Sequence, residues 1–233
     1  MNKEAFIKAL KELSINISED QLNDLETYYS LLIEYNKHTN LTRITDKEDV
    51  YLKHFYDSLT LTKAIKLTNQ SLLDVGTGAG FPGLVLKIIF PNIKLTLVDS
   101  LNKRINFLKA VVKRLDLSNV FIYHERAEEF AKVNREKFDV VTSRAVANLQ
   151  TLSEISLPMV MEGGYFIAMK AEAKKEVEQS IKAIKTLGGV LEKTIDFELP
   201  NGAGQRCLVR VRKITKTSVK YPRKFSEIKK KPL

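Results

Sequence analysis

The chain has 233 residues, 44% of them hydrophobic, which is enough for the core of one domain with a short extension. The start of the chain is charged, which predicts no signal peptide, and no apolar run approaches the roughly 20 residues that span a bilayer. The single cysteine, Cys207, predicts no intramolecular disulfide, and the three scattered histidines predict no zinc site. We therefore expect a cytoplasmic, monomeric protein without membrane or metal, whose net charge of +10 favours an anionic partner.

Apolar residues recur at helical spacing from about residue 3 to residue 36. Ser18 and Gln21 have the spacing of a capping box, so a second helix should begin near Glu19. Residues 40–46 are polar and predict a loop, and another helical segment follows towards Ile65. Residues 1–66 are therefore predicted to form a helical N-terminal extension.

Short apolar runs then alternate with helical segments in residues 67–215, which we expect to form the main domain. Strands are predicted at 71–75, 94–99, 120–123, 139–143 and 165–168, with helices beginning near residues 81, 102, 127, 148 and 173. Two β-rich runs, 190–198 and 207–213, follow without an intervening helix and predict an antiparallel hairpin. The α/β class expected is a mostly parallel, seven-stranded, Rossmann-like sheet ending in a hairpin, the plan of class I methyltransferases.

Clustered glycines follow the first predicted strand, in the segment from Asp74 to Gly83. Gly76 and Gly78 allow backbone to approach a ligand closely, and the following helix offers amide groups to a nucleotide-like cofactor. The spacing also fits dinucleotide enzymes, so it leaves a nicotinamide-dependent oxidoreductase open. The carboxylate of Asp74 favours the cationic end of S-adenosylmethionine over an anionic pyrophosphate.

Further cofactor contacts are predicted at the ends of the next two strands. Asp99 is placed to accept hydrogen bonds from both ribose hydroxyls, although it or Ser100 could instead cap the next helix. Ala127 and Glu128 follow the third strand, where an apolar wall and a polar group usually hold adenine. Phe81 could contact the methionine moiety or the ring, with core packing as the alternative.

Arg144 ends the fourth predicted strand, where residues facing the transferred methyl group are expected. The Asn/Asp-Pro-Pro-Tyr signature of amino-methyltransferases is absent there, and no cysteine is placed for covalent catalysis. An arginine suits guanine N7, because this atom needs no deprotonation and the guanidinium can donate to guanine O6 or to phosphate. Arg144 is therefore the candidate catalytic residue, with a plain ion pair to an acid as the alternative.

Together these motifs resemble the glucose-inhibited division protein B family from about Asn40 to the end of the chain. The resemblance rests on Asn40-Leu41-Thr42, His54 to Ser58, Leu73 to Gly83, Asp99 to Arg104 with Phe107-Leu108, Arg126-Ala127-Glu128, Phe138-Asp139 and Ser143-Arg144-Ala145. It implies methylation of guanine N7 in a decoding-region loop of bacterial 16S ribosomal RNA, with S-adenosylmethionine as cofactor.

Residues at positions that the family uses for the cofactor or its surroundings are Gly76, Phe81, Asp99, Ser100, Leu101, Ala127, Glu128 and Arg144. His54, Asp57, Lys103 and Arg104 match motif positions whose roles stay open. One departure is Lys170-Ala171, where members commonly have Lys-Gly, so an identical backbone turn is not expected.

The positive charge is concentrated at the carboxyl end. Residues 206–233 contain eleven basic residues and one acidic residue, and the first 205 residues carry 27 of each sign. The resemblance implies 16S ribosomal RNA, or the small ribosomal subunit, as the partner of this end and of its basic tail, residues 216–233. A solvated tail is the alternative from charge alone, and a catalytically silent RNA-binding assembly factor is the alternative function.

Overall fold

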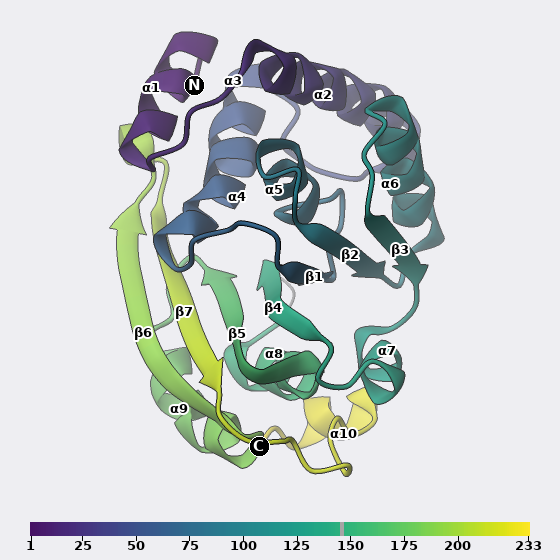
Figure 1. The fold of residues 1–233 in the computed structure, drawn as a ribbon, viewed down its shortest axis with the longest axis vertical. Helices are drawn as coiled ribbons and strands as arrows, with labels where there is room; N and C mark the ends of the chain where they lie inside the picture. Colours follow the sequence, from purple (N-terminus) through teal and green to yellow (C-terminus); the bar gives the residue numbers. More distant parts are fainter. Residues whose placement is uncertain (145–146) are drawn as a thin grey trace.

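The computed structural model describes residues 1–144 and 147–233; Ala145 and Val146, part of the segment predicted to follow the fourth strand, lie outside the described residues. The described residues form one sheet of seven strands in the order β3-β2-β1-β4-β5-β7-β6 (Figure 1). Its first five strands are parallel, and β7 runs antiparallel to both β5 and β6. The strands are β1 (Ser71–Val75), β2 (Lys94–Asp99), β3 (Val120–His124), β4 (Phe138–Arg144), β5 (Val160–Lys170), β6 (Gly189–Glu198) and β7 (Gln205–Lys213). The predicted fold class is confirmed.

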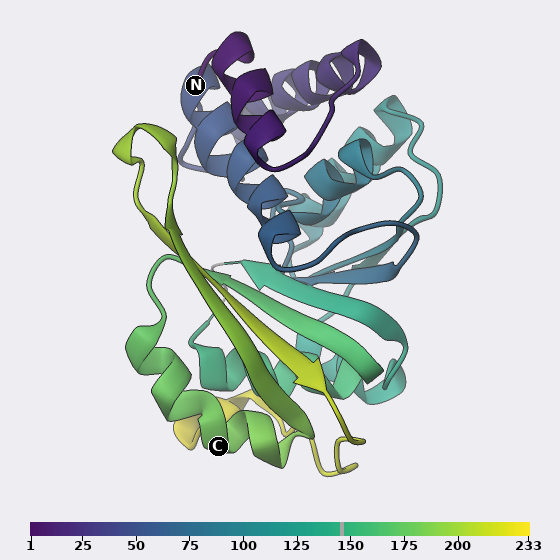
Figure 2. The ribbon, with the colours of Figure 1, turned by 60° about the vertical axis from the view of Figure 1, so that its left-hand side comes forward.

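Helices cover both faces of the sheet and make three layers (Figure 2). One face carries α1 (Lys3–Glu12), α2 (Glu19–Thr39), α5 (Gly83–Ile89) and α6 (Asn102–Arg114). The opposite face carries α7 (Ala127–Val133), α8 (Leu149–Ser156), α9 (Lys174–Thr186) and α10 (Phe225–Lys230). Buried residues form two clusters, one on each side, so burial of apolar surface on both faces fixes the sheet between the helices.

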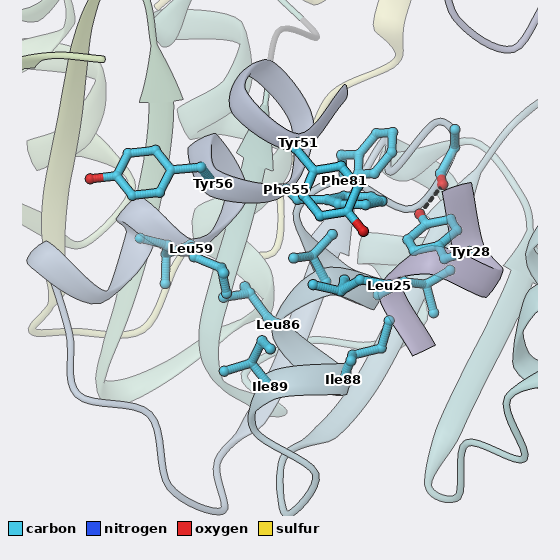
Figure 3. Packing of buried hydrophobic residues seen from close by; sticks show 14 of the residues in the cluster. Leu25, Tyr28, Tyr51, Phe55, Tyr56, Leu59, Phe81, Leu86, Ile88 and Ile89 are labelled. Carbon is cyan, nitrogen blue, oxygen red and sulfur yellow. Dashed lines mark hydrogen bonds between the residues drawn. The ribbon is translucent and has the colours of Figure 1, made fainter. Parts of the chain in front are cut away.

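The N-terminal helices share their core with the sheet. Both hydrogen bonds of the predicted capping box are present, 3.2 Å from Gln21 N to Ser18 Oγ and 3.0 Å from Ser18 N to Gln21 Oε1. Leu25 and Tyr28 of α2 pack with Phe55 and Phe81 in the cluster that reaches across to α5 (Figure 3). Residues 1–66 are thus continuous in packing with the main domain, and the division into three segments stays a prediction.

The helical segment before β1 is irregular. It consists of α3 (Lys47–Val50), the π-helical turn η1 (Tyr51–Tyr56), α4 (Asp57–Leu59) and the 3₁₀ turn η2 (Thr60–Lys63). Apolar spacing predicts a helix here without showing the wider π-turn, because both forms bury similar positions. Turns of this kind are common at functional sites, and His54 lies within this one.

Strand β5 begins at Val160, five residues before its predicted start at residue 165. The sequence does not indicate the beginning of this strand, because it contains Gly163 and Gly164, and glycine is depleted in regular strands. The pairing of β4 with β5 shifts register between Phe138 and Val140, as expected where glycines accommodate an irregularity. The later part of β5 keeps the predicted parallel pairing.

The basic carboxyl end packs against the protein. Tyr221 and Ile228 are buried, and Ile228 belongs to the same core cluster as α8. The solvated tail that charge alone allows is therefore wrong for this segment, although most of its lysines remain exposed. Within the described ranges, no helix is both long and apolar enough to cross a membrane.

Candidate active site

A cavity of about 960 Å³ opens at the carboxyl ends of β1, β2, β3 and β4. This volume lies in the upper part of the range for small-molecule sites, about 300–1,000 Å³. The predicted site residues that line it are Gly76, Gly78, Phe81, Asp99, Ser100, Ala127, Glu128 and Arg144. Leu101 and Asp74 are not among the described lining residues. Four parallel strands thus bring together residues up to 68 positions apart in sequence.

The glycine loop is shaped by close packing as well as by backbone conformation. Gly80 has φ +97°, and a Cβ on it would lie 2.5 Å from the Tyr28 hydroxyl oxygen and 2.6 Å from Leu84. A Cβ on Gly83 would lie 2.9 Å from Asp74 Oδ2. Tyr28 donates a hydrogen bond from α2 to the Ala79 carbonyl, which ties the loop to the N-terminal helices (Figure 3). Larger residues at these two glycines would displace the loop.

Asp74 holds the loop from beneath. Its fully buried Oδ2 accepts hydrogen bonds from Thr77 Oγ1 at 2.7 Å and from Gly83 N at 2.9 Å, and Oδ1 is buried without a partner among the described residues. Burial raises the pKa of this carboxyl to about 6. The direct contact expected between Asp74 and the cationic end of the cofactor stays a prediction: Asp74 is not among the described lining residues, and its side chain supports the loop that forms the cavity.

Asp99 joins the first two strands at the cavity. Its Oδ2 accepts from Gly78 N at 2.9 Å, and its Oδ1 accepts from Leu101 N at 3.0 Å. Arg104, whose role the sequence leaves open, donates to Oδ2 at 3.0 Å. Helix α6 has no side-chain cap at its first residue, so the capping alternative for Asp99 and Ser100 is not realised.

The far end of the cavity combines one buried acid with apolar groups. Glu128, at the start of α7, is 6% exposed and lines the cavity beside Ala127. Ile155 of α8 and Phe225 of α10 line it as well. Lys170 also faces this space and pairs with Glu176 at 2.9 Å, and Ala171 follows it along the wall. This end can therefore hold a flat, apolar ring that carries a hydrogen-bond donor.

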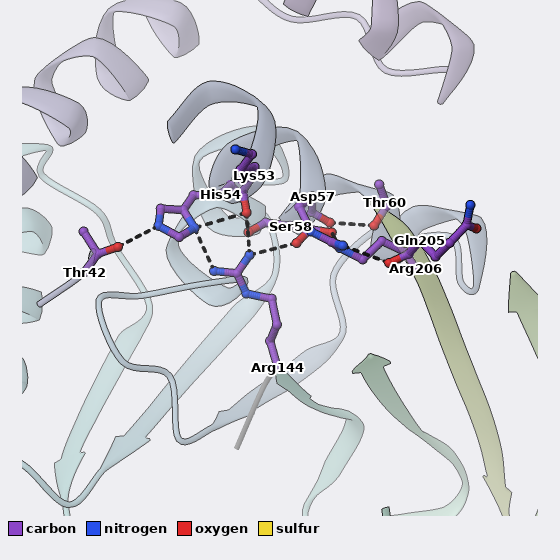
Figure 4. A network of polar contacts seen from close by, with 9 residues as sticks. All are labelled: Thr42, Lys53, His54, Asp57, Ser58, Thr60, Arg144, Gln205 and Arg206. Atoms are coloured by element: carbon purple, nitrogen blue, oxygen red, sulfur yellow. Dashed lines mark hydrogen bonds and ion pairs between the residues drawn. The ribbon is translucent and has the colours of Figure 1, made fainter. Parts of the chain in front are cut away.

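Arg144 lies in a polar network that links β4 to the π-turn and to β7 (Figure 4). Its guanidinium donates to the Lys53 carbonyl at 3.0 Å, to Asp57 Oδ2 at 3.1 Å and to His54 Nδ1 at 3.2 Å. Asp57 is buried and also accepts from Arg206 Nε at 2.9 Å. The ion pair weighed as an alternative for Arg144 is present, and the same side chain still lines the cavity.

His54 is held neutral at this network. Its ring stacks on Phe81 with centroids 4.4 Å apart, and Thr42 Oγ1 lies 2.9 Å from Nε2. Nδ1 lies 3.2 Å from Arg144 Nη2 and 3.1 Å from the Lys53 carbonyl oxygen, so a ring proton on Nε2 lets Arg144 donate to Nδ1, and one on Nδ1 lets the ring donate to Lys53. Burial, and then the nearby Arg144 charge, lower the pKa of His54 to about 3. The group therefore has no tendency to take up a proton at neutral pH.

Several site residues were missed from the sequence. Tyr28, Arg206 and Phe225 reach the loop, the network or the cavity from elements far from β1 in sequence. The sequence signal that pointed to the polar network was the family motif that contains His54 and Asp57, whose roles the sequence leaves open. Lys103, the fourth open position, donates to the Thr39 carbonyl at 2.6 Å and is not among the described lining residues.

Within the described residues, no group of three or more His, Cys, Asp or Glu side chains is arranged to hold a metal ion. The strand order, the glycine loop and the carboxylate at the end of β2 define the protein as having a class I methyltransferase fold. Solved structures agree on this fold. TrmN from Thermus thermophilus matches with a TM-score of 0.56 at 15% identity, over 69% of this chain and 49% of that one. YcgJ from Bacillus subtilis matches with a TM-score of 0.56 at 13% identity, over 70% and 100%.

Sequence comparison then defines the family. The family described as rRNA small subunit methyltransferase G matches residues 21–203. The ribosomal RNA small subunit methyltransferase G of Staphylococcus carnosus (strain TM300) is 49% identical over all of this chain and 99% of its own length. That of Limosilactobacillus reuteri (strain DSM 20016) is 50% identical over all of both chains. The chain belongs to this family, which confirms the resemblance drawn from its motifs.

Proposed function

We propose that the protein transfers a methyl group from S-adenosylmethionine to N7 of a guanine in the 16S RNA of the small ribosomal subunit. The observation that carries this proposal is the convergence of Asp99, Glu128 and Arg144 on one cavity. Two carboxylates suit the cofactor side, and one arginine suits the acceptor side. The family supplies the reaction class, and the geometry supports its cofactor and its acceptor atom.

The hydrogen bonds of the glycine loop argue against a dinucleotide. A pyrophosphate requires free backbone N–H groups at such a loop. Here Gly78 N donates to Asp99 and Gly83 N donates to Asp74, while Gly76 N and Gly80 N donate to backbone carbonyls. These four glycine amides are thus already used, two of them by carboxylates. This arrangement disfavours an anionic cofactor. It therefore argues against the alternative of a nicotinamide-dependent oxidoreductase.

The residues present fit S-adenosylmethionine. Asp99 would accept hydrogen bonds from the ribose hydroxyls, and Glu128 would accept one from the adenine amino group. Phe81 would contact the methionine end, where its ring lies beneath the Arg144 guanidinium, 5.2 Å from its centroid to Cζ. When bound, the cofactor supplies an electrophilic methyl group on sulfonium.

The acceptor side requires no general base. Guanine N7 presents a lone pair, so its bond to the methyl carbon forms as the carbon–sulfur bond breaks, and no proton leaves the base. Neutral His54 is consistent with this chemistry, since it takes up no proton. Arg144 would orient the base by donating to O6, a positioning contribution that acts through alignment.

Methyl transfer to small subunits tests the proposal directly. Purified subunits from cells lacking this protein are incubated with it and with tritium-labelled cofactor, and the modified nucleotide is mapped by mass spectrometry. We expect one N7-methylated guanine in 16S RNA. RNA binding without label in any preparation would support the silent assembly factor, and label on an exocyclic amine or a pyrimidine carbon would contradict the acceptor assignment. Parallel reactions with naked RNA identify the substrate form.

The proposed substrate also implies the partner and the cellular location that we expect for the protein. Ribosomal RNA would contact the exposed lysines near the carboxyl end through phosphate groups, with affinity that falls as salt rises. A bacterial protein acting on ribosomal subunits would work in the cytoplasm. A monomer stays the predicted state, and sedimentation analysis measures it.

A further inference from the structure

The C-terminal segment, residues 214–233, is anchored to the far face of the sheet by partly buried polar contacts. The Glu154 carboxylate, fully buried in α8, accepts from Arg223 N at 3.0 Å and from Arg223 Nε at 2.7 Å. The Arg135 guanidinium donates to the carbonyls of Thr217 and Tyr221. Gln150 Nε2, also on α8, donates to the Leu233 carbonyl at 2.7 Å. The segment therefore has a defined position relative to α8.

This anchoring places one aromatic ring at the cavity. Phe225 is the first residue of α10, two positions after Arg223, and Ile228 on the next turn is fully buried. Phe225 is 36% exposed as a residue, unlike the buried Tyr221 and Ile228 on either side, and it lines the cavity. A partly exposed phenylalanine facing a cavity has apolar surface available for a ligand.

The other residues at this end of the cavity indicate the chemistry of that ligand. Ala127 and Ile155 contribute apolar surface, and Glu128 contributes a carboxylate that is 6% exposed. Helices α7 and α10, which carry Glu128 and Phe225, both pack on α8. An apolar wall beside a buried carboxylate suits a heteroaromatic ring bearing an amino group, such as adenine.

We propose that Phe225 forms part of the adenine subsite, so that the C-terminal segment is a wall of the cofactor cavity as well as a basic surface. This inference rests on the proposed function, because it requires an adenine-containing cofactor. Cofactor affinity then depends on the last residues of the chain, and the lysines that follow on α10 lie beside that wall. Anchoring through Glu154 fixes the ring before the ligand arrives, which limits the entropy lost on binding.

Calorimetry with S-adenosylhomocysteine on full-length protein tests the inference. Phe225→Ala should weaken binding about tenfold, the order expected for loss of one aromatic contact, while Phe225→Leu should stay within about threefold of the wild type. Val219→Ala, in the same segment and 91% exposed, is the matched control and should bind as the wild type does. Binding of 5′-methylthioadenosine should fall by the same factor as binding of S-adenosylhomocysteine, because both contain adenine.

The outcomes separate the two proposals. Equal affinity of the wild type and Phe225→Ala overturns the adenine subsite and leaves the proposed function standing. If Phe225→Ala weakens only RNA binding, the ring belongs to the nucleic-acid surface, and the inference is likewise wrong. A wild-type protein that binds neither probe contradicts the proposed function itself, and the inference with it. Melting curves of each variant check that the fold is kept.

Discussion

The two ends of the chain cover opposite faces of the sheet and reach the same cavity in different ways (Figure 2). The N-terminal helices contribute polar groups: His54, Lys53 and Asp57 surround Arg144. The C-terminal segment contributes one aromatic side chain, Phe225, and has its own ion pair between Arg223, whose side chain is 23% exposed, and the buried Glu154. The difference leads us to expect that similar charged pairs serve different purposes. Arg144 lines the cavity, and we expect its network to serve transfer. Arg223 and Glu154 are not among the described lining residues, and we expect their pair to serve stability.

The largest effect is expected at Arg144. In Arg144→Ala, kcat for methyl transfer should fall by about 10²- to 10³-fold because the acceptor base loses its aligned donor, while cofactor affinity changes less than about threefold. Single-turnover transfer and calorimetry measure the two quantities. Arg210→Ala is the control, since Arg210 pairs with Glu192 and is not among the described lining residues. Equal losses of transfer and affinity would reduce Arg144 to a residue on the cofactor side.

The C-terminal pair should instead show its effect in stability. Arg223→Ala removes the ion-pair partner of the buried Glu154 carboxylate and leaves it only the backbone N–H of residue 223, which should cost about 3 kcal/mol and lower Tm by roughly 6–12 °C. Arg206→Ala is the comparison on the other side, where Asp57 keeps Arg144 as a partner, and it should cost only about 1 kcal/mol. Thermal unfolding measures both. Comparable losses of stability in the two variants would show that the two ion pairs contribute equally, which would contradict the contrast between the two regions.

Asp99 lies at the end of β2, outside both regions. Its replacement should weaken binding of the cofactor in the cavity that both regions line. Asp99→Ala should weaken S-adenosylhomocysteine binding about 100-fold, because the ribose hydroxyls lose a charged acceptor and Arg104 loses its partner. Calorimetry again provides the measurement. Wild-type affinity in this variant would show that the ribose assignment is wrong. Arg104→Ala isolates the ion pair, since it keeps the Asp99 carboxylate as acceptor for the ribose, for Gly78 N and for Leu101 N.

The N-terminal network should also be sensitive to acid. His54 has a folded pKa of about 3, below its ordinary value of 6.5, so the unfolded chain binds more protons between these values. Its stabilising contribution is therefore complete above pH 6.5 and is lost as pH falls towards 3. Asp74 acts in the opposite sense, since its pKa is raised to about 6, and its contribution is lost as pH rises from 3.8 to 6.

Unfolding of the wild type and of His54→Gln as a function of pH isolates the histidine. The wild type should be more stable at pH 7, and the difference should narrow as pH falls below 6.5, because the variant has no group to protonate there. A constant difference over pH 4–7 would contradict a neutral, buried His54. The contribution of Asp74 cancels in the comparison, since both proteins contain it.

The smallest effect is expected from the exposed lysines of the C-terminal segment. Truncation is a poor test, because it removes the buried Tyr221 and Ile228 from the core. Replacing Lys229, Lys230 and Lys231 with alanine should weaken RNA binding a few-fold and reduce its salt slope by up to about 3. Three exposed lysines on α1 provide a control of equal charge, namely Lys3, Lys8 and Lys11. Equal salt slopes in the two variants would show that RNA binding depends on the net charge of the protein and on no local contact with the C-terminal lysines.

Local pattern and family motifs determined the alternating elements, the hairpin and the capping box at Ser18. They also singled out Gly76, Asp99 and Glu128, which line the cavity and whose contacts with the cofactor stay a prediction. These depend on residues near in sequence, where periodicity, turn chemistry and strand ends act directly. Only the tertiary structure decided that Asp74 lies beneath the loop and that Arg144 meets His54 and Asp57, about 90 residues away. It also decided that Phe225, in a segment marked by its charge, reaches the cavity. Such contacts are set by packing across the sheet, which no local pattern encodes.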